Sequence, residues 1–212
     1  MFGMLMQGYV TTLQIFALTL LGAVPLGVVV ALGRLSRSKV LSGIMRLYIS
    51  LMRGTPLMLQ MFAVFFTPYY VFGRQTGPGY IFTAVIIAFI VNYAAYFAEI
   101  YRSGIQSMPR GQYEAAQVLG YSKSQTFFRI ILPQVWKRIL PAMGNEIVTL
   151  VKDTSLAFSI GLAEMFTQGR ALVASQRTMV PFALAALIYW VSCLLIELVL
   201  RQLEKRMSYY HD

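Results

Sequence analysis

The sequence predicts an all-α integral membrane protein with about five transmembrane helices. Of its 212 residues 58% are apolar and only 12% are charged, whereas charged residues make up about a quarter of a typical soluble domain. The charges are also clustered, which leaves long uncharged stretches. Each stretch can cross about 30 Å of hydrocarbon as a helix of roughly 20 residues. We expect the whole chain, residues 1–212, to form a single transmembrane domain.

The first span is predicted over residues 11–33, because no charged residue precedes Arg34. It contains Gly22, Pro25 and Gly27, which are tolerated in a membrane helix when neighbouring helices satisfy the loosened backbone. A cleaved signal peptide is the alternative for this segment, but such a peptide begins with a basic region and has a shorter apolar core. We therefore expect a retained span.

The second and third spans are predicted over residues 54–72 and 80–101, joined by a short loop. Pro56 and Pro68 lie within the second. A fourth span is predicted over residues 139–162 and a fifth over residues 179–200.

The fourth span is unusual because it contains Glu146, Lys152 and Asp153. Charges at membrane depth are unfavourable unless they face protein or water. These residues therefore mark a polar region inside the membrane.

The distribution of Lys and Arg predicts the orientation of the chain. Short loops rich in basic residues stay in the cytoplasm, and such residues are concentrated after the first, third and last spans. An odd number of spans then places the N-terminus outside and the C-terminus inside. The basic residues concerned are Arg34, Arg37, Lys39 and Arg46, then Arg102, Arg110, Lys123, Arg129, Lys137 and Arg138, and finally Arg201, Lys205 and Arg206.

The sequence argues against an enzyme and against a bound metal or cofactor. Cys193 and His211 are the sole cysteine and histidine, so we expect neither a disulfide within the chain nor a Cys- or His-ligated metal site. The chain has no GxxxxGK[ST] loop for a nucleotide. An intramembrane hydrolase is an alternative, but the one acidic pair within a span, Glu146 and Asp153, matches no hydrolase pattern.

The segment 102–138 between the third and fourth spans has the signals of a short helix, a turn and a second helix. Pro109 suits a first helical turn, and Gly120 suits the left-handed residue after a helix end. Ser122 and Gln125 form a capping box that opens the second helix, which Pro133 is expected to stop. DNA-reading helix-turn-helix motifs have a similar outline, but this second helix is too apolar and is tethered to spans at both ends.

Several motifs together resemble the permeases of bacterial ABC importers. The segment 102–138 is similar to their EAA loop at Glu114, Ala115 and Ala116, then at Gly120, and then at Ile130, Leu132 and Pro133. Residues 53–56, 98–105 and 152–156 resemble the branch of that family that carries polar amino acids such as histidine, glutamate, glutamine, arginine and opines. The resemblance covers nearly the whole chain.

The resemblance implies that a cytoplasmic coupling helix between spans three and four docks on a partner ATPase. Glu114 would make polar contacts with that ATPase, Ala115 and Ala116 would allow close approach, and Gly120 would set the angle between the helices. The alternative is that the alanines pack against the chain's own helices and Glu114 caps its helix locally.

The resemblance also implies the partners and the location. They are a cytoplasmic ATPase dimer that holds ATP and Mg, a second permease copy or a related paralogue, an extracytoplasmic binding protein, and an amino acid as solute. The chain itself would hold no cofactor, bind no nucleic acid and lie in the bacterial cell membrane.

Polar residues within the spans are candidates for the solute pathway. Asn92, Tyr96 and Glu99 are spaced at i, i+4 and i+7 and share one helix face. The alternatives are that Glu99 pairs with Arg102 at i+3, and that Lys152 and Asp153 neutralise each other or a neighbour between helices. A passive channel or carrier would use the same residues without an ATPase, and the sequence does not name the solute. The further candidates, all in the fourth span, are Lys152, Asp153, Thr154 and Ser155.

Overall fold

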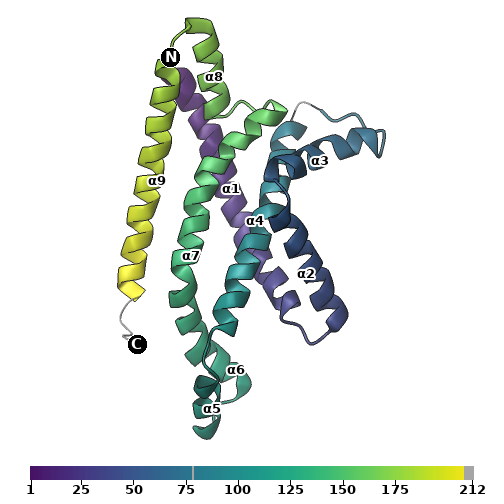
Figure 1. Cartoon of the computed structure of the whole chain (residues 1–212), viewed down its shortest axis with the longest axis vertical. Helices are drawn as coiled ribbons and strands as arrows, with labels where there is room; N and C mark the ends of the chain where they lie inside the picture. Colours follow the sequence, from purple (N-terminus) through teal and green to yellow (C-terminus); the bar gives the residue numbers. More distant parts are fainter. Residues whose placement is uncertain (78, 208–212) are drawn as a thin grey trace.

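The computed structural model describes residues 1–77 and 79–207, and every regular element within them is a helix. The prediction of an all-helical chain is therefore confirmed for this part, whereas His211 lies outside the described residues. Long helices run side by side along the molecule (Figure 1). They are α1 (Phe2–Arg34), α4 (Tyr80–Gln106), α7 (Leu132–Asp153) and α9 (Val180–Met207).

The short elements gather at the two ends of the molecule. At one end α5 (Arg110–Val118) and α6 (Lys123–Gln125) project beyond the long helices, and at the other α8 (Met165–Gln176) lies near the N-terminus (Figure 1). We call these the α5 end and the α8 end. The three segments rich in basic residues lie toward the α5 end, as the predicted orientation requires.

Within the described residues three helices, α1, α4 and α9, are long and apolar enough to cross a membrane. Helices α2 (Lys39–Gly54) and α3 (Leu57–Tyr70) pass the same test only as a pair, so up to four spans qualify. Helix α7 carries the charges predicted in the fourth span. The number of five spans, with the N-terminus outside, stays a prediction.

Most of the span predicted over residues 54–72 is α3, which alone is too short to pass this test, so this span stays a prediction. The chain forms α2 first, breaks, and continues as α3 at an angle of 108°. Pro56 causes the break, because a proline lacks an N–H donor and forces the preceding residue out of the helical conformation; Thr55 is extended, with φ −124° and ψ 148°. We call residues 53–60 the elbow.

Helix α1 is continuous through Gly22, Pro25 and Gly27. Gly22 and Gly27 lie where α1 packs against α4. A Cβ atom on Gly27 would be 2.9 Å from the Cβ of Phe97 and 3.2 Å from the carbonyl oxygen of Ala94. The glycines therefore let α1 pack tightly on α4, against the buried side chains of Phe89, Tyr93 and Phe97.

The predicted turn between α5 and α6 is confirmed. Gly120 has a φ of +78°. The capping box is present, since the Gln125 N–H donates to Ser122 Oγ (3.3 Å) and the Ser122 N–H donates to Gln125 Oε1 (2.9 Å).

Pro133 does not stop the second helix, contrary to the prediction. It lies in the first turn of α7, directly after a π-helical segment, η1 (Thr126–Ile131). The wider π turns shift the hydrogen-bond pattern before the proline. The carbonyl oxygen of Ile130 accepts a hydrogen bond from the side chain of Gln134 (Nε2–O 2.8 Å).

The predicted fourth span contains two kinds of helix. Helix α7 ends at Asp153 and continues as a 3₁₀ segment, η2 (Thr154–Ile160), which Gly161 ends in the left-handed conformation. The loop expected before the fifth span contains α8, which the sequence analysis did not predict.

Candidate functional site

Residues 102–138, which we call the EAA segment, expose only part of the EAA motif. The side chains of Glu114 and Ala115 are exposed on α5, but Ala116 is 1% exposed and lies on the side of α5 that packs on η1. Close to the exposed pair, Val118 and Leu119 are 88% and 73% exposed. Apolar side chains gathered on an exposed surface are typical of a protein interface.

Hydrogen bonds from Arg138 fix the base of the EAA segment to the helix bundle. The Arg138 guanidinium donates from Nη1 to the carbonyl oxygen of Ser107 (2.7 Å) and to its Oγ (3.2 Å). This contact joins the start of α7 to the turn between α4 and α5.

Asn92 is 3% exposed, and its side-chain amide stabilises the elbow through hydrogen bonds. Its Nδ2 donates to the carbonyl oxygen of Met52 (3.0 Å) and to Oε1 of Gln60 (2.9 Å). Gln60 in turn donates from Nε2 to Met52 O (2.9 Å) and to the backbone and side-chain oxygens of Thr55 (3.1 and 2.8 Å). These bonds satisfy the carbonyl groups that the break leaves without a helical partner, as a broken membrane helix requires.

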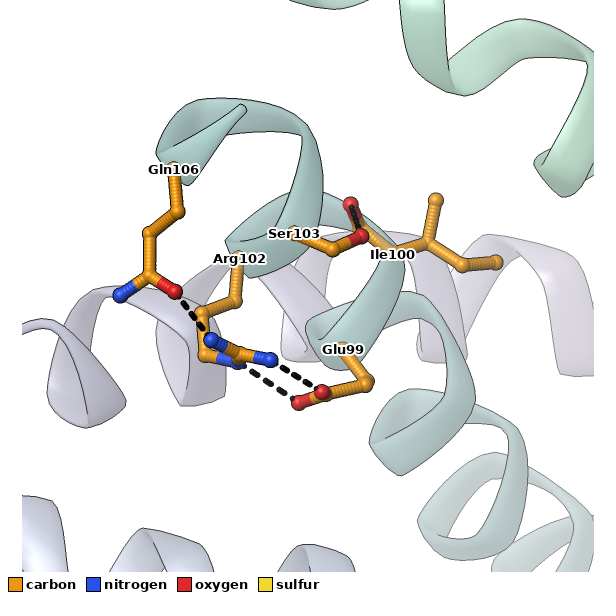
Figure 2. A network of polar contacts seen from close by, with 5 residues as sticks. All are labelled: Glu99, Ile100, Arg102, Ser103 and Gln106. Atoms are coloured by element: carbon orange, nitrogen blue, oxygen red, sulfur yellow. Dashed lines mark hydrogen bonds and ion pairs between the residues drawn. The ribbon is translucent and has the colours of Figure 1, made fainter. Parts of the chain in front are cut away.

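Tyr96 and Glu99 lie farther along the same helix and are partly exposed. Arg53, at the end of α2, stacks over the Tyr96 ring at 5.4 Å from its centre. Figure 2 shows that Arg102 donates hydrogen bonds to both carboxylate oxygens of Glu99, with Nε 2.8 Å from Oε2. Arg102 also donates a hydrogen bond to Oε1 of Gln106. The alternative of an i, i+3 ion pair for Glu99 is thus what the structure shows.

The charges of Lys152 and Asp153 point in different directions and form no ion pair in the described structure. Asp153 accepts a hydrogen bond from the Tyr93 hydroxyl of α4 (2.7 Å), whereas Lys152 lines a cavity between α7 and α9. Thr154 is fully buried and donates to the Val151 carbonyl oxygen (2.7 Å). Ser155 donates to the Lys152 carbonyl oxygen (2.8 Å) and lines the same cavity.

This cavity has a volume of about 590 Å³ and is open on one side. Its surface is mainly apolar, with a few polar groups, which is the usual composition of a site for a small solute. Its polar and sulfur-containing lining residues are Lys152, Ser155, Tyr189, Cys193 and Glu197.

Comparison with known proteins places this geometry in a family. The family model described as "binding-protein-dependent transport system inner membrane component" matches residues 23–209. The chain belongs to this family. Its function is therefore that of a membrane-embedded permease component.

Curated relatives match along nearly the whole chain. The L-cystine transport system permease protein TcyB of Bacillus subtilis is 36% identical, over 96% of this chain and 86% of that protein. The glutamine transport system permease protein GlnP of Escherichia coli is 34% identical, over 97% and 93%. The arginine transport system permease protein ArtQ of Bacillus subtilis is 33% identical, over 96% and 92%.

Solved structures show the same fold. The crystal structure of an amino acid ABC transporter with histidines has a chain that aligns with a TM-score of 0.87 and 32% identity, over 96% of this chain and 94% of that one. An inward-facing structure of the MetNI methionine ABC transporter aligns with a TM-score of 0.71 at 16% identity and shows the fold alone.

The permease also contains a buried carboxylate, Glu164, in the segment between the predicted fourth and fifth spans, where the sequence analysis named no site. Glu164 is 0% exposed and caps α8, accepting from the N–H groups of Phe166 (2.6 Å) and Thr167 (2.7 Å) and from the Tyr189 hydroxyl (3.3 Å). Burial raises the pKa of the Glu164 carboxyl, and these hydrogen bonds oppose that rise. An acid directly before a helix was the available signal.

Replacing Glu164 with alanine should destabilise the α8 end of the permease. The change removes a helix cap, which contributes about 1 kcal/mol to stability. It also leaves two N–H groups without acceptors, which costs about 1–3 kcal/mol for each group that water does not reach. We expect a clear fall in the melting temperature of the purified protein. Gln176→Ala, at the exposed far end of α8, is the matched control; equal melting temperatures for the two variants would contradict this role of Glu164.

Among residues 1–77 and 79–207, no group of three or more His, Cys, Asp or Glu side chains is placed to hold a metal ion.

Proposed function

We propose that this permease is the membrane subunit of an ATP-driven importer that carries an amino acid into a bacterial cell. The observation that carries the proposal is the match of nearly the full chain to permeases of cystine, glutamine and arginine transport systems. These relatives differ in the solute that their names give, but each aligns with at least 96% of this chain. The common fold therefore serves α-amino acids as a class.

The ATPase would dock on α5, with ATP and Mg on the partner. Glu114 and Ala115 are exposed there beside the apolar pair Val118 and Leu119. Closure of the ATPase dimer would move α5, and the contact between Arg138 and Ser107 would pass that movement to α4 and α7. In thermodynamic terms ATP is a ligand that favours one of two packings of the permease.

A second permease chain would complete the pathway. The cavity between α7 and α9 is open, and α9 exposes large apolar side chains such as Trp190 and Leu195. A homodimer or a pair with a related chain would cover such surfaces and enclose the solute. The α8 end would face an extracytoplasmic binding protein, and the α5 end would face the cytoplasm.

The predicted pathway residues divide by their positions. Lys152 and Ser155 line the cavity and would contact the solute, with Asp153 close by on the α4 side. Tyr96 and Glu99 are partly exposed on α4 and would line the path farther along. Asn92 and Thr154 are buried and bonded to backbone carbonyls, so we assign them to the support of the path.

The test is ATP-dependent uptake of a labelled amino-acid mixture by proteoliposomes that hold the permease, its copurified ATPase and the matching binding protein. Accumulation against a gradient is the expected result and names the solute. Equilibration that ignores ATP would replace the importer with a passive channel or carrier.

A further inference from the structure

The outward side of α2 carries a row of cations that form no ion pair within the described residues. Lys39, Arg46 and Arg53 are each seven residues apart, so they lie on one face of the helix. All three side chains are exposed, as are Gly43 and Ser50 between them. At about 1.5 Å per residue the row extends over roughly 21 Å. We call these five residues the polar row of α2.

An apolar row runs next to the polar row. Val40, Ile44, Leu47 and Leu51 are all exposed, with Val40 and Leu47 more than 70% exposed. The remaining face of α2 packs on the bundle through Tyr48, whose hydroxyl donates to the Val91 carbonyl oxygen, and through the buried Ile49. Lipid accounts for the apolar row but not for cations at several depths, because charged side chains facing hydrocarbon are strongly unfavourable.

The polar row meets a polar face of α4 at the elbow. Arg53 lies over Tyr96, and the partly exposed Glu99 and Arg102 follow along α4 toward the α5 end. Helices α2 and α4 then separate toward that end (Figure 1). Glu99 is already held by Arg102 (Figure 2), so the uncompensated charge on these faces is that of Lys39, Arg46 and Arg53.

We infer that the polar row of α2 and the facing residues of α4 line a water-filled cytoplasmic half of the solute pathway, with Arg53 at its inner limit binding the carboxylate of the solute. This inference rests on the proposed function. Cystine, glutamine and arginine differ in side-chain charge but share the α-carboxylate. A row of cations attracts the α-carboxylate that these solutes share and repels inorganic cations.

The elbow gives Arg53 a fixed position for this role. The hydrogen bonds of Asn92 and Gln60 hold the backbone at residues 52–55, and the guanidinium rests on an aromatic ring. Arg53 forms no ion pair in the described residues.

The first test measures exposure to water in the absence of ATP. With Cys193 replaced by serine, single cysteines are placed by Ser50→Cys on the polar row and by Leu47→Cys on the apolar row. A membrane-impermeant maleimide is added to the cytoplasmic face of proteoliposomes. Labelling at position 50 should be much faster than at position 47, and equal rates would overturn the inference.

The second test measures recognition of the carboxylate. L-glutamine or L-arginine should slow labelling at position 50, whereas glutaminamide and argininamide, which lack the carboxylate, should not. Arg53→Gln should abolish this protection and reduce ATP-dependent uptake by roughly tenfold, as for the loss of one charge-assisted contact. Arg53→Lys should retain part of the protection from labelling and part of the uptake. Arg37 is an exposed cation outside the row, and Arg37→Gln should change neither the protection nor the uptake.

The two proposals fail in different ways. Protection by the amides as well as by the acids, or wild-type uptake in Arg53→Gln, would overturn the role of Arg53. Failure of the wild type to accumulate any amino acid would count against the importer function, while the comparison of positions 50 and 47 would still decide which face of α2 meets water.

Discussion

Glu114→Lys should abolish ATP-driven uptake and weaken the association of the permease with its ATPase. Glu114 is exposed on α5, so its replacement leaves the fold unchanged and alters only the docking surface. Reversal of a charge at a protein interface costs roughly 2 kcal/mol or more when its partner becomes buried. That corresponds to a loss of more than tenfold in affinity. The measurements are copurification of the ATPase and initial uptake in proteoliposomes.

Two matched variants separate docking from other effects. Glu114→Gln removes the charge without reversing it and should retain part of the uptake. Gln117→Lys adds a cation elsewhere on the exposed surface of α5 and should have the smaller effect. Normal ATPase binding and uptake by Glu114→Lys would refute the assignment of Glu114 to the coupling surface. A lowered melting temperature would instead indicate a local structural role.

Features set by neighbouring residues could be predicted from the sequence. The capping box of Ser122 and Gln125 and the left-handed Gly120 depend on contacts within a few residues, and both are present. The helical character of the chain follows from its long apolar stretches. The resemblance in the EAA segment led to the same family as the comparison of the full chain.

Features set by contacts between distant residues could not be predicted. The periodicity that placed Asn92 on a polar face was real, but its amide contacts Met52 and Gln60 across the elbow. Pro56 marks the break locally, whereas no local pattern shows which distant side chain stabilises it. The side chains of Lys152 and Asp153 point in different directions. Asp153 accepts a hydrogen bond from Tyr93 of α4, a residue distant in the sequence. Pro133 continues a helix because the preceding π turns change the hydrogen-bond pattern.

The role of Gly27 also depends on a contact with a distant helix, which the sequence alone does not show. Replacing Gly27 should have a large effect on folding. As a sequence feature it is a helix breaker inside a span, yet α1 does not bend there into separate helices. Its function depends on α4, whose backbone atoms Ala94 O and Ala98 N would lie 3.2 and 3.3 Å from an added Cβ. Backbone atoms within a packed helix cannot move aside as the end of a side chain can.

Gly27→Leu should therefore force α1 away from α4 and greatly reduce the yield of folded permease. Overpacking of a core costs about 1–3 kcal/mol, and more where the backbone must shift; α1 and α4 form the main helix pair of the bundle. Gly3→Leu is the control in the same helix, because nothing lies within 4 Å of its added Cβ. Size-exclusion chromatography and thermal unfolding in detergent would measure the difference. Equal stability of the two variants would show that α1 can leave α4 without loss, and that the tight contact at Gly27 is not what holds the first helix to the bundle.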